Sequence, residues 1–275
     1  MSNLLPVHAN LTLTFTGTHH LGTGRAEGLL NRTVRRDARG RAYVPGTALK
    51  GALREAAERL AGVLDAQLDS TDASVRFGMR HYMGDAVAGA RCHAPRPEGM
   101  CRGAAACIIC RVFGNVFTGH RLIVDDAYAM ADPLLTKIEG RLREHESELT
   151  SSAADAAHGR REQITRTSID RRRRGVRSGA LFTSEFIRER VTFRGSIDGQ
   201  VGQTTLDYSA DGAPAELVFL AATLRFMRQV GAGASLGRGH CHVALDDNVL
   251  VAGGTRHDVD DLIRDNIEEL AYLNL

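Results

Sequence analysis

The sequence predicts an α+β protein in which a small antiparallel sheet is elaborated by long loops. Residues 7–15 alternate apolar and polar side chains, which is typical of a strand with one buried face. Residues 214–230 place three leucines and a methionine along one side of a helix. Helical and strand-like segments are interleaved, but the helices are few and the segments between them are long.

The first half of the chain yields one strand, one long connection and one helix. The buried face of the strand is expected to carry Val7, Ala9, Leu11, Leu13 and Phe15. Residues 17–46 are rich in glycine and arginine without a clear period, and connections this long are usually functional or mobile. A helix is then expected from Thr47, which can cap it, to Gly62, where a helix end favours glycine. Its apolar residues at helical spacing are Leu49, Ala52, Leu53, Ala56 and Leu60.

The second half continues the alternation of elements. The predictions are, in order, a strand over 121–129, a helix over 133–149, a loop over 150–162, β-segments over 180–197, the helix over 214–230, a glycine loop over 231–239, a strand over 240–245 and a helix over 258–272. Asp258 is the expected cap of the last helix.

Composition limits the classes of protein to consider. The chain has 275 residues, which suits one large domain or two small ones, and 43% hydrophobic residues, as in ordinary soluble proteins. No apolar run approaches the roughly 20 residues that span a bilayer. The N-terminus lacks the basic segment and the cleavage site of a signal peptide, so we expect no membrane association and a cytoplasmic location.

Arginine is the prominent charged residue. Lysine occurs only at Lys50 and Lys137, so 33 of the 35 basic residues are arginine. A GC-rich genome explains part of this bias. The distribution is more informative: residues 159–190 hold ten arginines against four acids, and residues 22–41 hold six more. Runs of like charge repel one another and commonly bind a polyanion, so the two stretches predict a phosphate track. Aromatic residues are only 5%, which favours recognition of the backbone over extensive base stacking.

Three of the five cysteines lie within ten residues, in CRGAAACIIC at 101–110. A disulfide is disfavoured in the expected cytoplasm, and the odd count leaves one cysteine over. Inert packing is an alternative, and it is the reading we favour for Cys241. The C-x-x-C spacing of Cys107 and Cys110 suits a tetrahedral metal, so we expect structural Zn²⁺. The expected ligands are Cys92, Cys101, Cys107 and Cys110, with His93 or His81 as alternatives to Cys92.

Two glycine-containing segments superficially suggest nucleotide binding. GTALKG at 46–51 lacks the spacing of a phosphate-binding P-loop. GAGASLG at 231–237 follows a helix and precedes a strand, which is the wrong order for a dinucleotide site. With Arg238 beside it, however, the backbone N–H groups of this loop are able to line an anion.

Four segments in this order resemble one family. They are YVPGTALKGALREAAE at 43–58, CIICRVFG at 107–114, SIDRRRRGVRSGALFTSEFI at 168–187 and GASLGRGHCHV at 233–243. Together they resemble the RAMP superfamily, specifically the repeating backbone subunit of type III CRISPR effector complexes and their derivatives. The resemblance implies a single domain over 1–275 with a ferredoxin-like (RRM-like) core, a zinc-binding insertion at about 80–115 and a β-hairpin thumb at about 165–182.

The resemblance also implies a role. Several copies would polymerise along a CRISPR RNA, beside other effector subunits, and hold the duplex of guide and target, with RNA the expected target. Base pairing would then read the sequence. The residues expected to contact RNA are Arg25, Arg32, Lys50, Arg171, Arg172, Arg173, Arg174, Arg177, Gly237 and Arg238.

Cleaving members of the family carry an aspartate in the loop before the first helix, six residues ahead of a second aspartate that follows an arginine. Here Arg36-Asp37 matches the later pair, and counting back gives Asn31. An amide cannot act as a carboxylate base or metal ligand, although Glu27 is nearby. We therefore expect a scaffold that does not cut, served by a separate nuclease such as the β-CASP enzyme of type VII systems.

Three alternatives remain open. The first is a target-slicing endoribonuclease that uses Glu27 or Asp37. The second is a CRISPR repeat-processing endoribonuclease that uses histidine, with His19, His20, His240 and His242 as candidates. The third is a structural zinc protein that binds RNA without specificity.

Overall fold

The computed structural model describes residues 4–38, 40–67, 106–117, 119–130, 161–170, 172–188, 191–203 and 212–272, without the side chains of 65–67, 178 and 267–272. The predicted helix over 133–149 lies outside these residues, as do Arg171, Cys92, Cys101 and most of the predicted insertion. None of the described helices is both long and apolar enough to cross a membrane.

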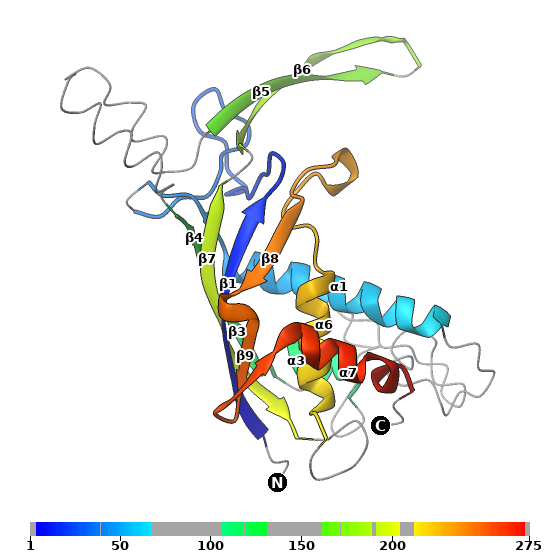
Figure 1. The fold of residues 1–275 in the computed structure, drawn as a ribbon. Coiled ribbons are helices and arrows are strands. Elements are labelled where there is room, and N and C mark those ends of the chain that lie inside the picture. Colours follow the sequence, from blue (N-terminus) through cyan, green and yellow to red (C-terminus); the bar gives the residue numbers. More distant parts are fainter. Residues whose placement is uncertain are drawn as a thin grey trace, which may run out of the picture.

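The described elements form an α+β protein with antiparallel sheets, as the sequence predicts (Figure 1). The strands are β1 (Leu4–Phe15), β2 (Tyr43–Val44), β3 (Leu122–Val124), β4 (Ala127–Ala129), β5 (Arg161–Asp170), β6 (Gly175–Ile187), β7 (Thr192–Gly202), β8 (Cys241–Leu245), β9 (Val249–Ala252) and β10 (Thr255–Asp258). The helices are α1 (Gly46–Gln67), α3 (Ile108–Phe113), α6 (Ala215–Phe226) and α7 (Val259–Tyr272), with short 3₁₀ turns η3 (Ala234–Leu236) and η4 (Asp246–Asn248).

The main sheet has eight strands and is organised around β1. Its order is β10-β9-β1-β7-β4-β2, with β3 also paired to β7 and β8 also paired to β1. The longest ladder joins β1 to β7, from Leu4 opposite Gly202 to Thr14 opposite Thr192. The predicted alternation is confirmed, because every odd-numbered residue from Val7 to Phe15 is buried.

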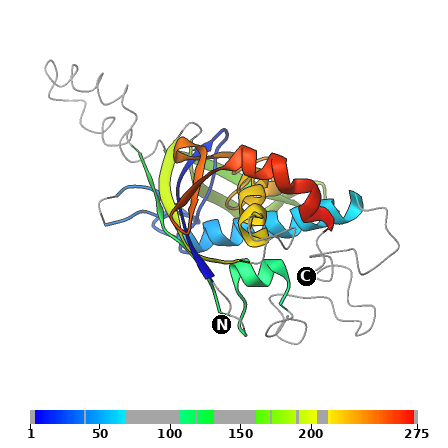
Figure 2. The ribbon, with the colours of Figure 1, turned by 60° about the horizontal axis from the view of Figure 1, so that its bottom comes forward.

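The described helices all cover one face of this sheet (Figures 1 and 2). Helix α6 is the central one, buried from Ala215 to Leu224, and it packs against both α1 and α7. A buried carboxylate, Glu216, fixes its first turn: it pairs with Arg111 of α3 and with Arg121, each at 3.3 Å, and accepts the Gly202 N–H at 2.6 Å. The predicted cap of α7 is confirmed, since Oδ1 of Asp258 accepts the N–H groups of residues 260 and 261.

Helix α1 begins and ends differently from the prediction. It starts at Gly46 and continues through Gly62 to Gln67, and its first N–H is satisfied by Asp126 at 2.7 Å rather than by Thr47. A β-carbon at Gly46 would lie 1.9 Å from the carbonyl oxygen of Val124, so only glycine fits there. The predicted strand over 121–129 is two strands, β3 and β4, which both pair with β7 and are separated at residues 125 and 126, where the register shifts by one residue.

Strands β5 and β6 form a separate two-stranded hairpin that projects from one end of the body (Figure 1). Its tip holds the arginine run, and Oδ1 of Asp170 accepts the backbone N–H groups of Arg172 and Arg173 there. The hairpin extends the range that the resemblance implies, about 165–182, by several residues on both sides.

The root of the hairpin is fastened to the loop over 17–42 by a buried carboxylate, Glu185, whose side chain is 2% exposed. Glu185 pairs with Arg36 and contacts Arg161 at 3.5 Å, and its Oε2 accepts the Val34 N–H at 3.0 Å. Its carbonyl oxygen lies 2.7 Å from Nδ1 of His20. One residue of β6 thus contacts four partners on two segments, the loop over 17–42 and β5.

A second contact at the root involves His19. Its backbone exchanges two hydrogen bonds with Ile187, and its fully buried ring stacks on Phe15 with centroids 3.6 Å apart and meets Phe193 edge-on. Burial, assisted by the nearby His20, lowers the pKa of His19 to about 3. His19 is therefore neutral near physiological pH and acts as an aromatic core residue.

The depressed pKa of His19 predicts acid sensitivity. The unfolded chain takes up this proton near pH 6.5 and the folded chain only near pH 3, so the stabilisation is complete above about pH 6.5 and declines as the pH falls below it. Between about pH 7 and pH 5 the free energy of unfolding should fall by about 2 kcal/mol. Urea denaturation should show a flatter pH profile for His19→Phe, and an unchanged profile for exposed His242→Phe. Equal slopes in all three proteins would contradict the assignment.

Removing the charge of Glu185 should loosen the hairpin root. Glu185→Gln deprives Arg36 and Arg161 of the carboxylate that they contact, while keeping the volume of the side chain. Because both guanidinium groups are partly exposed, we expect a loss of roughly 2 kcal/mol in the free energy of unfolding, below that of a fully buried pair. Chemical denaturation measures it, with exposed Glu55→Gln as the matched control. Equal stability of the two variants would show that Glu185 is not an anchor.

Candidate nucleic-acid interface

Three segments far apart in the sequence meet at the hairpin root. The loop over 17–42 pairs with β6, where Asn31 N donates to Thr183 O at 2.8 Å and Arg32 O accepts from Glu185 N at 2.9 Å. The glycine loop over 231–239 joins the same loop, since Ala232 N donates to His20 O and Gly239 N to Thr18 O. Figure 1 shows both loops reaching the hairpin at the same end of the body.

A cation–aromatic stack connects the hairpin to the glycine loop. The buried ring of Phe186 has the guanidinium of Arg238 3.9 Å from its centroid and that of Arg166 5.8 Å away. The His20 ring lies 5.5 Å from the same centroid. Arg238, predicted as an RNA contact from its neighbouring glycines, therefore also holds the loop against the hairpin.

The hairpin tip presents unneutralised positive charge. Arg172, Arg173, Arg174 and Arg177 are all exposed, and no ion pair between described residues involves any of them. Exposed Ile169 and Val176 face each other across the two strands at the tip. Such a surface, which is basic and partly apolar, suits a polyanion with exposed planar groups.

The arginines of the loop over 17–42 divide into two groups. Arg25 and Arg32 are exposed, as an RNA contact requires. By contrast, Arg35 donates to Gly22 O, Arg36 pairs with Glu185 and Arg41 pairs with Asp37. Arg32 therefore lies at the hairpin root. Arg35, Arg36 and Arg41 instead hold the loop over 17–42 in its folded position.

Lys50 lies on the first turns of α1, where its Nζ donates to Leu122 O at 2.7 Å. Burial and the nearby Arg54 lower its pKa. Gly237 has φ +70°, which permits the tight turn that ends η3. The exposed arginines are thus the stronger candidates for phosphate contacts, and Lys50 primarily fastens α1 to β3.

The three candidate catalytic residues, Glu27, Asn31 and Asp37, lie at different points of the loop over 17–42. Glu27 begins an exposed tight turn that Leu30 closes. The amide oxygen of Asn31 accepts the Thr183 N–H at 2.8 Å, and Asp37 is bound by the side chain and the backbone of Arg41. Each of Asn31 and Asp37 therefore already has a structural role in the folded chain.

The four histidines of the repeat-processing alternative lie in two places, the loop over 17–42 and the start of β8. His19 is buried with a pKa near 3, and Nδ1 of His20 is held by the Glu185 carbonyl. His240 and His242 are exposed on and beside β8. A histidine that is neutral down to about pH 3 cannot serve as a general acid near neutrality.

The described half of the predicted zinc set is compatible with a metal. Sγ of Cys107 caps α3 by accepting the Cys110 N–H at 3.4 Å, so the two sulfurs belong to one helical turn. Nη2 of Arg54 donates to Sγ of Cys110 at 3.7 Å. Burial alone would lower the pKa of Arg54, but its contacts with Cys110 and Glu58 raise it. A guanidinium beside a sulfur favours the thiolate, which is the form that binds metal.

The open face of the main sheet carries an aromatic pair beside its central strands. Tyr128 of β4 is exposed and stacks on Tyr43 of β2 with ring centroids 5.7 Å apart, and the guanidinium of Arg41 lies 5.0 Å from the centroid of the Tyr128 ring. Along β1 and β7 this face presents no Phe, Tyr or Trp, and there Arg194 pairs with Asp246.

Sequence reasoning missed the residues that assemble the interface. Glu185, Phe186 and Arg166 all lie in the basic stretch over 159–190, and the first two also lie in the predicted β-segments over 180–197. Nothing in their spacing indicates that they hold the hairpin root in place. The one available signal was the acid of SEFI at 184–187, a lone carboxylate directly before the apolar pair Phe186 and Ile187. Such a carboxylate requires partners when it is buried.

Comparison with known proteins identifies the family. The model of the RAMP superfamily matches residues 12–242. One similar solved structure is titled "Type III-B Cmr-beta Cryo-EM structure of the Apo state"; it aligns with 86% of this chain and 96% of the matching chain, at 12% identity and a TM-score of 0.49. No curated protein matches. Because the family model covers most of its length, this chain belongs to the RAMP superfamily.

Proposed function

We propose that this protein is a CRISPR RNA-binding backbone subunit of a type III or type III-derived effector complex. The observation that carries the proposal is that the exposed arginines of the hairpin and of the loop over 17–42 lie at one end of the molecule, where the glycine loop also meets them. Membership of the RAMP superfamily and the four ordered sequence motifs support it. Strand order β8-β1-β7-β3, with helices α1 and α6 as connections, supports the ferredoxin-like core.

In this proposal several copies lie along one guide, with other effector subunits beside them, and the hairpin acts as the thumb. The exposed arginines hold phosphates, which carry no sequence information, so that base pairing with the guide selects the target. The guide and the complementary target, which we take to be RNA, are then the main partners.

We further propose that the subunit does not cut its target. Asn31 stands where the family motif places an aspartate, and its amide oxygen is bonded to the hairpin backbone. Asp37 is neutralised by Arg41. A separate nuclease would then supply cleavage.

Structural zinc remains part of the proposal. Cys107 and Cys110 would supply two thiolates, with Cys101 and one of Cys92, His93 or His81 completing the set. Bound zinc would hold the predicted insertion against α3, since such segments have little core of their own.

The hairpin arginines should determine the salt dependence of RNA binding. Arg172→Gln with Arg173→Gln removes two phosphate contacts, which should lower the slope of log affinity against log salt by about 1.4. Titrations of a single-stranded guide RNA at several salt concentrations measure this slope. The matched control is Arg256→Gln with Arg264→Gln, which removes two exposed arginines from the C-terminal part of the chain. Equal slopes for both double variants would refute the phosphate track.

Zinc content should depend on the cysteine pair. Elemental analysis of the purified protein should find about one zinc per chain, and Cys107→Ser with Cys110→Ser should abolish it. Cys241→Ser is the matched control, because Cys241 is buried in β8 with a pKa raised by burial to about 12. Metal-free wild-type protein would remove zinc from the proposal.

The particle should hold its target intact. Native mass spectrometry of the protein co-expressed with a CRISPR array should find several copies on one RNA. Labelled complementary RNA incubated with this particle and Mg²⁺ should stay uncut. Cuts at regular spacing that disappear in Glu27→Ala with Asp37→Ala would instead establish a slicing ribonuclease.

A further inference from the structure

One arginine of α1 contacts the short helix that carries the predicted metal ligands. Helices α1 and α3 pack against each other, and the guanidinium of Arg54 lies between them. Its Nη1 donates to Gly114 O at 2.7 Å, and its Nη2 donates to Sγ of Cys110 at 3.7 Å. Its Nε donates to Oε1 of Glu58, one turn later on α1, at 3.1 Å. All three nitrogens of this guanidinium therefore have a partner, and one partner is a cysteine sulfur.

The two oxygen partners fix the orientation of the guanidinium. Gly114, which ends α3, has φ +80°, and its N–H donates to Cys110 O at 3.0 Å. A β-carbon at Gly114 would lie 2.1 Å from the carbonyl oxygen of Gly119, so the chain is closely packed where its carbonyl meets Arg54. Glu58 holds the other side of the planar group. Because a guanidinium is rigid, the position of the nitrogen beside the sulfur follows from these two contacts.

The sulfur end of this arrangement is buried. Cys110 is fully buried, and Sγ of Cys107 caps the same turn of α3. A zinc ion with three or four thiolate ligands carries a net negative charge, and a buried negative charge requires a compensating cation or hydrogen-bond donors. Arg54 supplies both, because it is a cation that donates an N–H to the sulfur.

Two simpler roles for Arg54 explain less of this geometry. A phosphate contact is disfavoured, because the side chain is only 21% exposed and its donors are already engaged. A role in helix packing alone needs only the contacts with Glu58 and Gly114, which already join α1 to the end of α3. The donation to Cys110 is the contact that neither role requires.

We propose that Arg54 is a positioning residue of the zinc site, which holds the metal-bound sulfur of Cys110 from outside the ligand set. The inference rests on the zinc site of the proposed function and names the residue that joins this site to α1. Hydrogen bonds to metal ligands commonly change metal affinity by about 10- to 100-fold. Bound zinc would then stabilise α1 as well as the predicted insertion, because α1 contributes a partner to one of the ligands.

The test measures metal affinity and the electronic state of the sulfur in full-length protein. Competition with a coloured chelator should show zinc binding about tenfold weaker in Arg54→Gln than in the wild type. With Co²⁺ in place of zinc, the sulfur-to-cobalt charge-transfer band of this variant should move to longer wavelength, because a sulfur without its hydrogen bond gives up electron density more easily. Arg54→Lys keeps the charge but not the fork, and it should recover part of the affinity.

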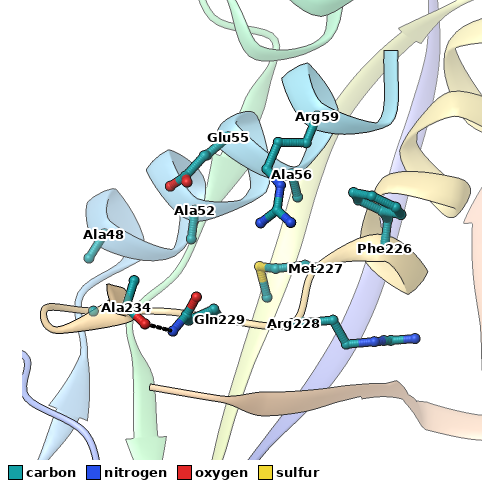
Figure 3. Close-up of a pocket in the computed structure, with 11 residues that line it drawn as sticks. Ala48, Ala52, Glu55, Ala56, Arg59, Phe226, Met227, Arg228, Gln229 and Ala234 are labelled. Atoms are coloured by element: carbon teal, nitrogen blue, oxygen red, sulfur yellow. Dashed lines mark hydrogen bonds between the residues drawn. The ribbon is translucent and has the colours of Figure 1, made fainter. Parts of the chain in front are cut away.

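Arg59→Gln is the matched control. Arg59 is an exposed arginine of the same helix, and Figure 3 shows it on the side of α1 that lines a pocket with Phe226 and Arg228. Its guanidinium lies 5.9 Å from the centroid of the Phe226 ring. Zinc affinity and the cobalt band should stay as in the wild type.

Four results would overturn the inference. If Arg54→Gln binds zinc as tightly as the wild type, Arg54 does not serve the site. If its affinity falls while the cobalt band stays in place, Arg54 only packs α1 against α3. If Arg59→Gln has the same effect, any positive charge on α1 suffices. If the wild type binds neither metal, the zinc proposal fails together with this inference, whereas RNA binding is judged separately by the salt dependence of the hairpin variants.

Discussion

The buried carboxylate of Glu185 is the interaction on which the arrangement of the interface depends. It is a charge that water cannot reach, so the fold must supply its counter-charges and hydrogen-bond donors. These come from Arg36 and the Val34 N–H, which lie on the loop over 17–42, and from Arg161 of β5. Together with the buried side chains of Phe186 and Ile187, this carboxylate specifies one position of the root. Glu216 gathers Arg111, Arg121 and Gly202 in the same manner at the opposite end of the core.

This arrangement divides the arginines of the chain by function. Those that are half-buried beside Glu185, Glu216 and Asp37 hold loops in place, namely Arg36, Arg41, Arg111 and Arg121. Those at the hairpin tip, together with Arg25 and Arg32, are exposed to solvent. A count of arginines therefore overstates the number of guanidinium groups that are exposed and available to a ligand.

The regular elements were largely predictable because each one depends on its own sequence pattern. Alternation located β1, and helical spacing located α1, α6 and α7, with Asp258 as the cap of the last. The start of α1 was not predictable, because its cap is Asp126, distant in the sequence, and its glycine is required by contact with Val124. The interface was predictable only in part, for the same reason. The four consecutive arginines at 171–174 indicate a basic surface from the sequence alone, whereas Glu185 and Phe186 act through partners that are distant in the sequence.

The hairpin can also be considered as a mechanical lever. Strand β6 runs from its anchored root to the arginine tip over roughly 30 Å, at about 3.3 Å per residue. A rotation of about 10° at the root displaces the tip by about 5 Å, more than the rise of about 3.4 Å between successive base pairs. In the proposed function the tip meets a helical ligand, and the angular rigidity that Glu185, Phe186 and His19 give to the root would set the positional accuracy of that contact. A small loss of packing at the root would then shift the tip by a whole base step.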